Sequence, residues 1–209
     1  MIDPGLKILR TDISATPVEW IGVEQAVKLY CQEQVAYVLG SNLCIVHGGI
    51  NALSGIQSRV EVNSILCTLG RQRSNYRHHP DYTPPLNNNT LFRRDGNHCM
   101  YCGGKFPDFQ LSRDHIKPIS RGGEDVWTNV VAACKRCNHF KGDRHPEEVG
   151  LELLAVPFKP THAEYIYLSG RRILADQMEF LEAHFPRNSE LLKRLKLPVD
   201  GNENASSKS

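Results

Sequence analysis

Four of the seven cysteines form two Cys-x-x-Cys pairs, Cys99 with Cys102 and Cys134 with Cys137. Zn²⁺ prefers four tetrahedral ligands, and the thiolates of two such pairs supply all four. Residues 103–133 separate the pairs, which is longer than the ~15–20 residues usual for zinc ribbons. The leading interpretation is therefore a structural zinc site interrupted by a long insert. A redox or disulfide use of the thiols, or the absence of any metal, is the alternative.

The insert contains a second group suited to chemistry, the dipeptide Asp114-His115. An imidazole titrates near neutral pH, so it can take a proton from water. A carboxylate is the kind of oxygen ligand that Mg²⁺ prefers. Neighbouring side chains of a strand point to opposite sides, so the two groups face different directions unless the backbone twists between them. The dipeptide alone is a weak signal of function.

The elements that must position these residues are two strands and a helix. The insert fits two strands joined by a turn at Gly122-Gly123, and a helix then carries the second cysteine pair. Thr90 is expected to cap a short helix over 91–95. The flanking segments predict a helix over 23–30, strands over 35–39 and 59–63, and helices over 146–154, 170–185 and 189–197.

Taken together, these residues resemble the HNH endonuclease family, in the zinc-containing branch of the ββα-metal nucleases. The matching patterns are R-D-G-x-x-C-x-Y-C-G over 94–103, D-H-I-x-P with G-G over 114–123, W-x-N-x-V over 127–131, and C-x-x-C-N-x-x-K-G-D-R over 134–144. The resemblance implies an α+β fold in which four cysteines hold a zinc ion that staples the nuclease module. It also implies hydrolysis of phosphodiester bonds in DNA, leaving 5′-phosphate and 3′-hydroxyl ends.

The resemblance assigns roles to individual residues. His115 is the general base, and Asp114 and Asn138 hold Mg²⁺ or a similar divalent cation. Asn129 belongs to the catalytic set because it holds the loop and orients His115. His139 is an alternative to Asn138 as ligand, but neighbouring helical residues point ~100° apart, and the C-N-x-x-K-G pattern favours Asn138.

The overall charge of +2 does not by itself predict a nucleic-acid partner. Residues 93–145, however, hold ten Lys and Arg against six Asp and Glu, so a polyanion site is expected there. The proposed DNA contacts within this segment are Lys141, Arg144, Arg113 and Arg94. The expected partner is double-stranded DNA and not a membrane, and a double-strand break would need a dimer or two cutting events.

The expected organisation is a small α+β unit over 1–70, a basic connector over 71–89, the nuclease domain over 90–160, C-terminal helices over 161–198 and a disordered tail over 199–209. The first residues do not resemble a secretory signal, and the odd number of cysteines argues against a disulfide framework. A reducing, cytoplasmic location is therefore expected. The three remaining cysteines, Cys31, Cys44 and Cys67, are expected to be small buried side chains.

Two other functions are alternatives to the nuclease. A zinc-ribbon module that binds nucleic acid without cleaving it has no need of the Asp114, His115, Asn129 and Asn138 set. A thiol redox protein would hold reactive disulfides and no metal. The sequence does not indicate the target site or the biological process that uses the cleavage.

Overall fold

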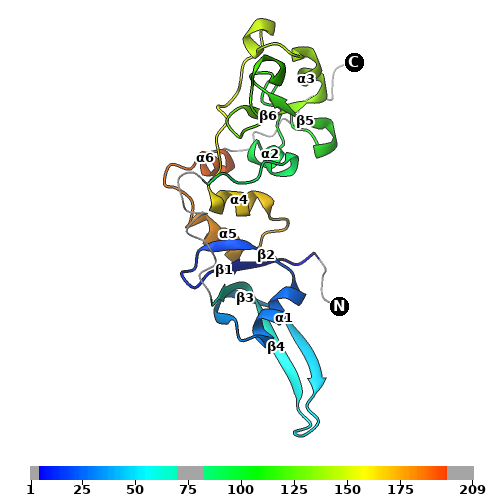
Figure 1. Cartoon of the computed structure of the whole chain (residues 1–209), viewed down its shortest axis with the longest axis vertical. Coiled ribbons are helices and arrows are strands. Elements are labelled where there is room, and N and C mark those ends of the chain that lie inside the picture. Colours follow the sequence, from blue (N-terminus) through cyan, green and yellow to red (C-terminus); the bar gives the residue numbers. More distant parts are fainter. Residues whose placement is uncertain (1–4, 70–81, 197–209) are drawn as a thin grey trace, which may run out of the picture.

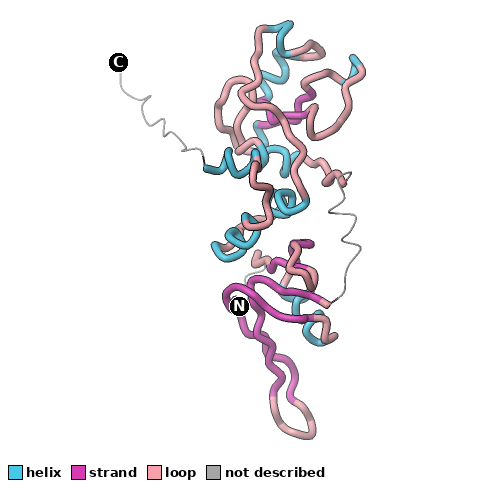
Figure 2. Tube along the Cα trace, turned by 90° about the vertical axis from the view of Figure 1, so that its left-hand side faces the viewer, coloured by secondary structure: helices cyan, strands magenta, loops and turns pink. Residues whose placement is uncertain are grey.

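The computed structural model describes residues 5–69 and 82–196. The described elements are stacked along one long axis, with a β-hairpin at one end and a strand-strand-helix unit at the other (Figures 1 and 2). Most of the predicted basic connector and the predicted disordered tail lie outside the described residues. Within the described ranges, no helix has the length and apolar character needed to cross a membrane.

A four-stranded sheet forms the N-terminal part, in the order β2-β1-β4-β3. The strands are β1 (Ile8–Thr11), β2 (Pro17–Ile21), β3 (Val35–Ile50) and β4 (Gln57–Thr68). Only β1 and β4 pair in parallel; the other pairs are antiparallel. The two predicted strands are confirmed, but each is part of a longer strand, because β3 and β4 extend together as a hairpin arm (Figure 1).

The predicted helix over 23–30 is confirmed as α1 (Val23–Cys31), which packs its buried Ala26 against the sheet. The expectation for the three other cysteines is wrong in part. Cys67 is buried, but Cys44 is half-buried and Cys31 is exposed. Cys31 is the last residue of α1, a helix whose one buried residue is Ala26.

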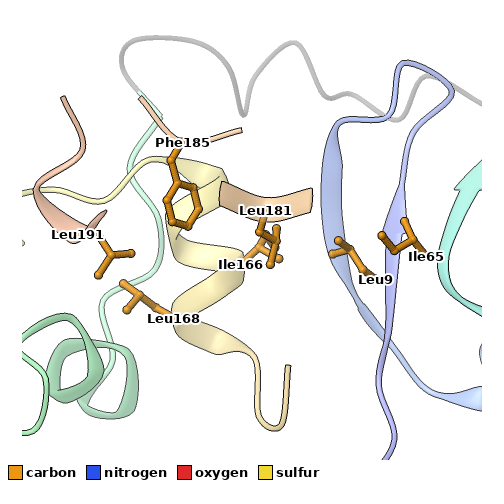
Figure 3. Close-up of a cluster of buried hydrophobic side chains, with 7 residues drawn as sticks. All are labelled: Leu9, Ile65, Ile166, Leu168, Leu181, Phe185 and Leu191. Atoms are coloured by element: carbon orange, nitrogen blue, oxygen red, sulfur yellow. The ribbon is translucent and has the colours of Figure 1, made fainter. Parts of the chain in front are cut away.

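Three C-terminal helices lie between the sheet and the nuclease-like unit: α4 (His162–Ser169), α5 (Ala175–Glu182) and α6 (Glu190–Lys196). Their buried side chains share one core with Leu9 and Ile65 of the sheet (Figure 3). The predicted helix over 170–185 is confirmed only in part, as the shorter α5, and α4 was not predicted. Thr161 caps α4 by accepting a hydrogen bond from the Glu164 amide, and the chain turns at Gly170 before α5 begins.

The nuclease-like unit contains α2 (Asn88–Arg94), β5 (Leu111–His115), β6 (Val130–Cys134) and α3 (Lys135–Lys141). Strands β5 and β6 pair antiparallel and α3 follows β6 directly, which confirms the predicted strand-strand-helix order. Helix α2 is capped by Asn87 and not by Thr90, whose amide donates to the Asn87 side chain. The predicted helix over 146–154 is only a short 3₁₀ turn, Pro146–Val149.

Candidate functional site

The two cysteine pairs meet at one point although residues 103–133 separate them. The four sulfur atoms of Cys99, Cys102, Cys134 and Cys137 lie within 4.8 Å of one another. A tetrahedral zinc ion bound at about 2.3 Å would place its sulfurs ~3.8 Å apart, so the cluster fits this ion. We call these residues the four-cysteine cluster. The cluster joins the turn before β5 to the start of α3, and is thus compatible with a structural zinc.

The electrostatics of the four-cysteine cluster favour a cation at its centre. Burial opposes ionisation of Cys99, but the backbone N–H groups of Cys102, Cys134 and Tyr101 outweigh it and lower the pKa of that thiol. Burial and the neighbouring sulfurs raise the pKa of Cys137. Four thiolates this close repel one another unless a metal neutralises them. All the described cysteines are free, so none of them is joined in a disulfide.

His115 lies at the end of β5, and its side chain is 23% exposed. Its Nε2 atom lies 2.8 Å from Oδ1 of Asp125, which the sequence reasoning did not select. The other carboxylate oxygen of Asp125 accepts a hydrogen bond of 2.6 Å from Nη1 of Arg113. Desolvation of this carboxylate opposes its ionisation, but the bonds from Arg113 and His115 outweigh that cost and lower its pKa. An anionic group is therefore held beside the imidazole.

Asp114 points to the opposite face of β5 and is buried, with 4% of its surface exposed. Its Oδ1 atom lies 3.1 Å from Nζ of Lys141, and its Oδ2 atom accepts a hydrogen bond from the Tyr101 hydroxyl. Burial and this carboxylate raise the pKa of Tyr101, so the phenol stays protonated as the donor. The Lys141 ammonium also donates to the backbone carbonyl of His115 over 2.8 Å.

This arrangement does not fit the divalent-cation site that the sequence suggested. Both oxygens of Asp114 accept hydrogen bonds, and one of the two donors is the Lys141 ammonium, whose positive charge opposes a second cation at the same carboxylate. Asn138 lies on the same side of β5, where its amide donates to the Ser112 hydroxyl over 2.9 Å. His139, the alternative ligand, is exposed on α3.

Asn129 closes the loop between β5 and β6. Its side-chain oxygen accepts from the Lys117 amide over 2.9 Å, and its amide donates to the carbonyls of Lys117 (3.1 Å) and Glu124 (2.8 Å). A Cβ atom at Gly123 would lie 1.9 Å from the Lys117 carbonyl oxygen, so only glycine allows the loop to fold this tightly. The amide of one side chain thus ties together both ends of the loop that carries Asp125.

The comparisons with known proteins bear on this segment. Residues 99–154 match the model of the HNH endonuclease family. This segment is therefore similar to that family. A search of the curated proteins finds no match to the chain. We call residues 99–154 the HNH segment; it holds the four-cysteine cluster, His115 and the loop that Asn129 closes.

Two of the cationic residues proposed to contact DNA are buried and serve other purposes. Arg94 is 1% exposed, and its guanidinium binds Asp95 and the carbonyls of Trp127, Val130 and Phe158. Lys141 is also 1% exposed and is paired with Asp114, as described above. Both charged groups are bonded to partners inside the fold, which disfavours their predicted contact with DNA.

The two other cationic residues are nearer the surface. Arg113 is 20% exposed and is bonded to Asp125. Arg144 is exposed, where its guanidinium donates to the carbonyl of Phe140 over 2.6 Å. Lys117, which the sequence reasoning passed over, is exposed two residues after His115. Lys117 is distinguished by its position in the loop closed by Asn129 and not by any motif.

Proposed function

We propose that the HNH segment is an active endonuclease that hydrolyses phosphodiester bonds in DNA, with His115 as the general base. The observation that carries the proposal is the partly exposed imidazole of His115 at the end of β5, held by a carboxylate within a segment that matches this family. Such an imidazole can receive the proton of an attacking water molecule. The proposed substrate is double-stranded DNA, and the family description supports the coarser part of this proposal, a nucleic-acid substrate.

The proposed reaction assigns limited tasks to the residues of the chain. The water oxygen attacks phosphorus, its proton passes to His115, and the bond from phosphorus to the 3′ oxygen breaks as that oxygen takes up a proton from solvent. The exposed charges of Lys117 and Arg144 are suited to bind backbone phosphates. A divalent cation such as Mg²⁺ would neutralise charge on the scissile phosphate, and the requirement for one stays a prediction.

One observation favours the second candidate, a nucleic-acid-binding module without catalysis. Asp114, the carboxylate next to His115 in sequence, is paired with Lys141 and has no free oxygen. If cleavage requires a cation at Asp114, this ion pair opposes the binding of that cation.

The proposal also includes a reducing, cytoplasmic location, which would keep the four thiols available to zinc. It further includes that one site cuts one strand, so that a double-strand break needs a dimer or two events.

A plasmid-nicking assay on the zinc-loaded protein tests the proposal. The parent is expected to convert supercoiled to open-circular DNA in Mg²⁺ and to stop in EDTA. His115→Ala is expected to lose nicking at least ~100-fold, while its zinc content and unfolding midpoint match the parent. His184→Ala removes an exposed histidine that follows the C-cap of α5 and serves as the matched control.

The outcomes separate the candidates. A His115→Ala protein that nicks like the parent shows that the base is misassigned. A parent that binds DNA but does not nick it with Mg²⁺, Mn²⁺ or Zn²⁺ supports the non-catalytic module. Comparing Asn138→Ala with His139→Ala then decides which residue of α3 matters, since loss of nicking only in His139→Ala would reverse the assignment.

A further inference from the structure

We propose that Asp125 is the positioning residue of His115, and that it directs the imidazole so that Nδ1 accepts the proton of the attacking water. This inference rests on the proposed function. It assigns the positioning of His115 to a carboxylate that lies ten residues away in sequence and not to the neighbouring Asp114.

The contact itself determines the tautomer of His115. An ionised carboxylate only accepts hydrogen bonds, so the nitrogen that faces it must carry the hydrogen. Nε2 of His115 lies 2.8 Å from Oδ1 of Asp125. In the neutral imidazole, a hydrogen on Nε2 leaves the lone pair on Nδ1. When Nδ1 takes a proton from water, the imidazolium cation that forms is stabilised by the anionic partner, which itself stays ionised.

Asp125 can act in this way because it is fixed at its second oxygen. Nη1 of Arg113 lies 2.6 Å from Oδ2 of Asp125, and Nε of Arg113 donates to the Asn88 side chain over 3.0 Å. Arg113 and His115 are two residues apart on β5, so they share one face of the strand. The carboxylate therefore bridges two side chains of the same strand, and one rotamer of Asp125 satisfies both.

The loop that carries Asp125 is held by the middle Asn of the family pattern. The Asn129 amide donates to the carbonyl of Glu124, the residue before Asp125, over 2.8 Å. Asn129 thus acts on His115 indirectly, through this loop and Asp125. Asp114 does not compete for the role, because it faces the other side of β5, where both of its oxygens are bonded to other groups.

The test compares Asp125→Asn with Asp125→Ala. Arg113 has no acceptor, so it will draw the amide oxygen of the new Asn and leave the NH₂ group facing His115. That NH₂ group requires a bare Nε2, which moves the hydrogen of the neutral ring to Nδ1 and blocks the base. Alanine leaves the ring without a partner but does not impose the wrong tautomer. The Asn variant, although closer in shape, is expected to be the slower enzyme.

The first readout does not depend on activity. Long-range ¹H–¹⁵N NMR of the neutral His115 ring is expected to show the hydrogen on Nε2 in the parent and on Nδ1 in Asp125→Asn. Glu124→Gln, which changes the neighbouring exposed carboxylate, is the matched control and is expected to keep the parent tautomer. A parent ring with its hydrogen on Nδ1, or an Asp125→Asn ring unchanged from the parent, overturns the inference even if the protein proves not to be a nuclease.

The second readout is nicking under saturating and limiting DNA. Asp125→Asn is expected to lose ~100-fold or more in kcat and Asp125→Ala ~10-fold, both with KM close to the parent, because Asp125 acts through the ring and not on phosphate. Equal or greater loss in Asp125→Ala would mean a merely structural role for this residue and refutes the inference. An inactive parent with the expected tautomers refutes the proposed function alone.

Discussion

Replacing Lys141 by methionine is expected to destabilise the zinc-loaded protein by about 3–5 kcal/mol, the usual cost of removing one partner from a buried ion pair. Its side chain is 1% exposed and that of Asp114 is 4% exposed, so solvent screens the pair very little. Methionine fills the space of the lysine stem but leaves the carboxylate with only the Tyr101 hydroxyl. The His115 carbonyl also loses its donor.

The magnitude separates this arrangement from one in which Lys141 faces DNA. A solvent-exposed ion pair contributes only about 0–1 kcal/mol, so its loss would scarcely move the unfolding curve. The control Lys135→Met, at the exposed start of the same helix, is expected to stay within about 0.5 kcal/mol of the parent.

The assay is urea unfolding followed by circular dichroism, for the parent, Lys141→Met, Asp114→Asn and the double variant. Because the two side chains are in contact, the double variant is expected to recover roughly 0.5–3 kcal/mol relative to the sum of the single changes. Strictly additive effects, or a Lys141→Met curve that overlays that of Lys135→Met, would refute the buried pair. Either result would make Asp114 a candidate cation ligand again.

Two further predictions concern stability. Asp176 accepts hydrogen bonds from the Ser41 amide (2.7 Å) and the Ser64 hydroxyl (2.6 Å), which outweigh desolvation and lower the pKa of this carboxyl from 3.8. Its contribution to the free energy of unfolding is therefore complete above that pH and is lost as the pH falls through the lower pKa of the folded state. Asp176→Asn should melt at a lower temperature than the parent at neutral pH, and this difference in melting temperature should disappear in acid. Removing metal from the four-cysteine cluster with a chelator is expected to remove the protection of β5, β6 and α3 from amide hydrogen exchange, while the four-stranded sheet of β1 to β4 keeps its protection. Unchanged hydrogen exchange in α3 would contradict a structural metal.

Local patterns predicted the elements of the HNH segment well. Cysteine spacing, the Gly-Gly turn and the residues around Asp114-His115 led to two strands, a helix and a four-sulfur cluster, and all of these are present. The helix boundaries were less successful. Asn87 replaces Thr90 as a cap, and Thr161 caps a helix that was not expected. Asn and Thr both cap helices, so residue type alone does not choose between Asn87 and Thr90.

In the candidate site, too, some features were predictable from the local sequence and others were not. Lys141 and Arg94 belong to a basic segment, and nothing local distinguishes a lysine that faces solvent from one that neutralises a buried carboxylate. Asp125 has no motif of its own, and only the fold of its loop brings it to His115.

The chain order by itself determined which atoms are available: four thiols in two pairs, an imidazole beside a carboxylate, and the glycines that let a loop turn back. Tertiary structure alone decided which carboxylate meets the imidazole. Alternation along β5 sends Asp114 and His115 to opposite faces, so the partner of each comes from elsewhere: Lys141 of α3 for one and Asp125 of the loop for the other.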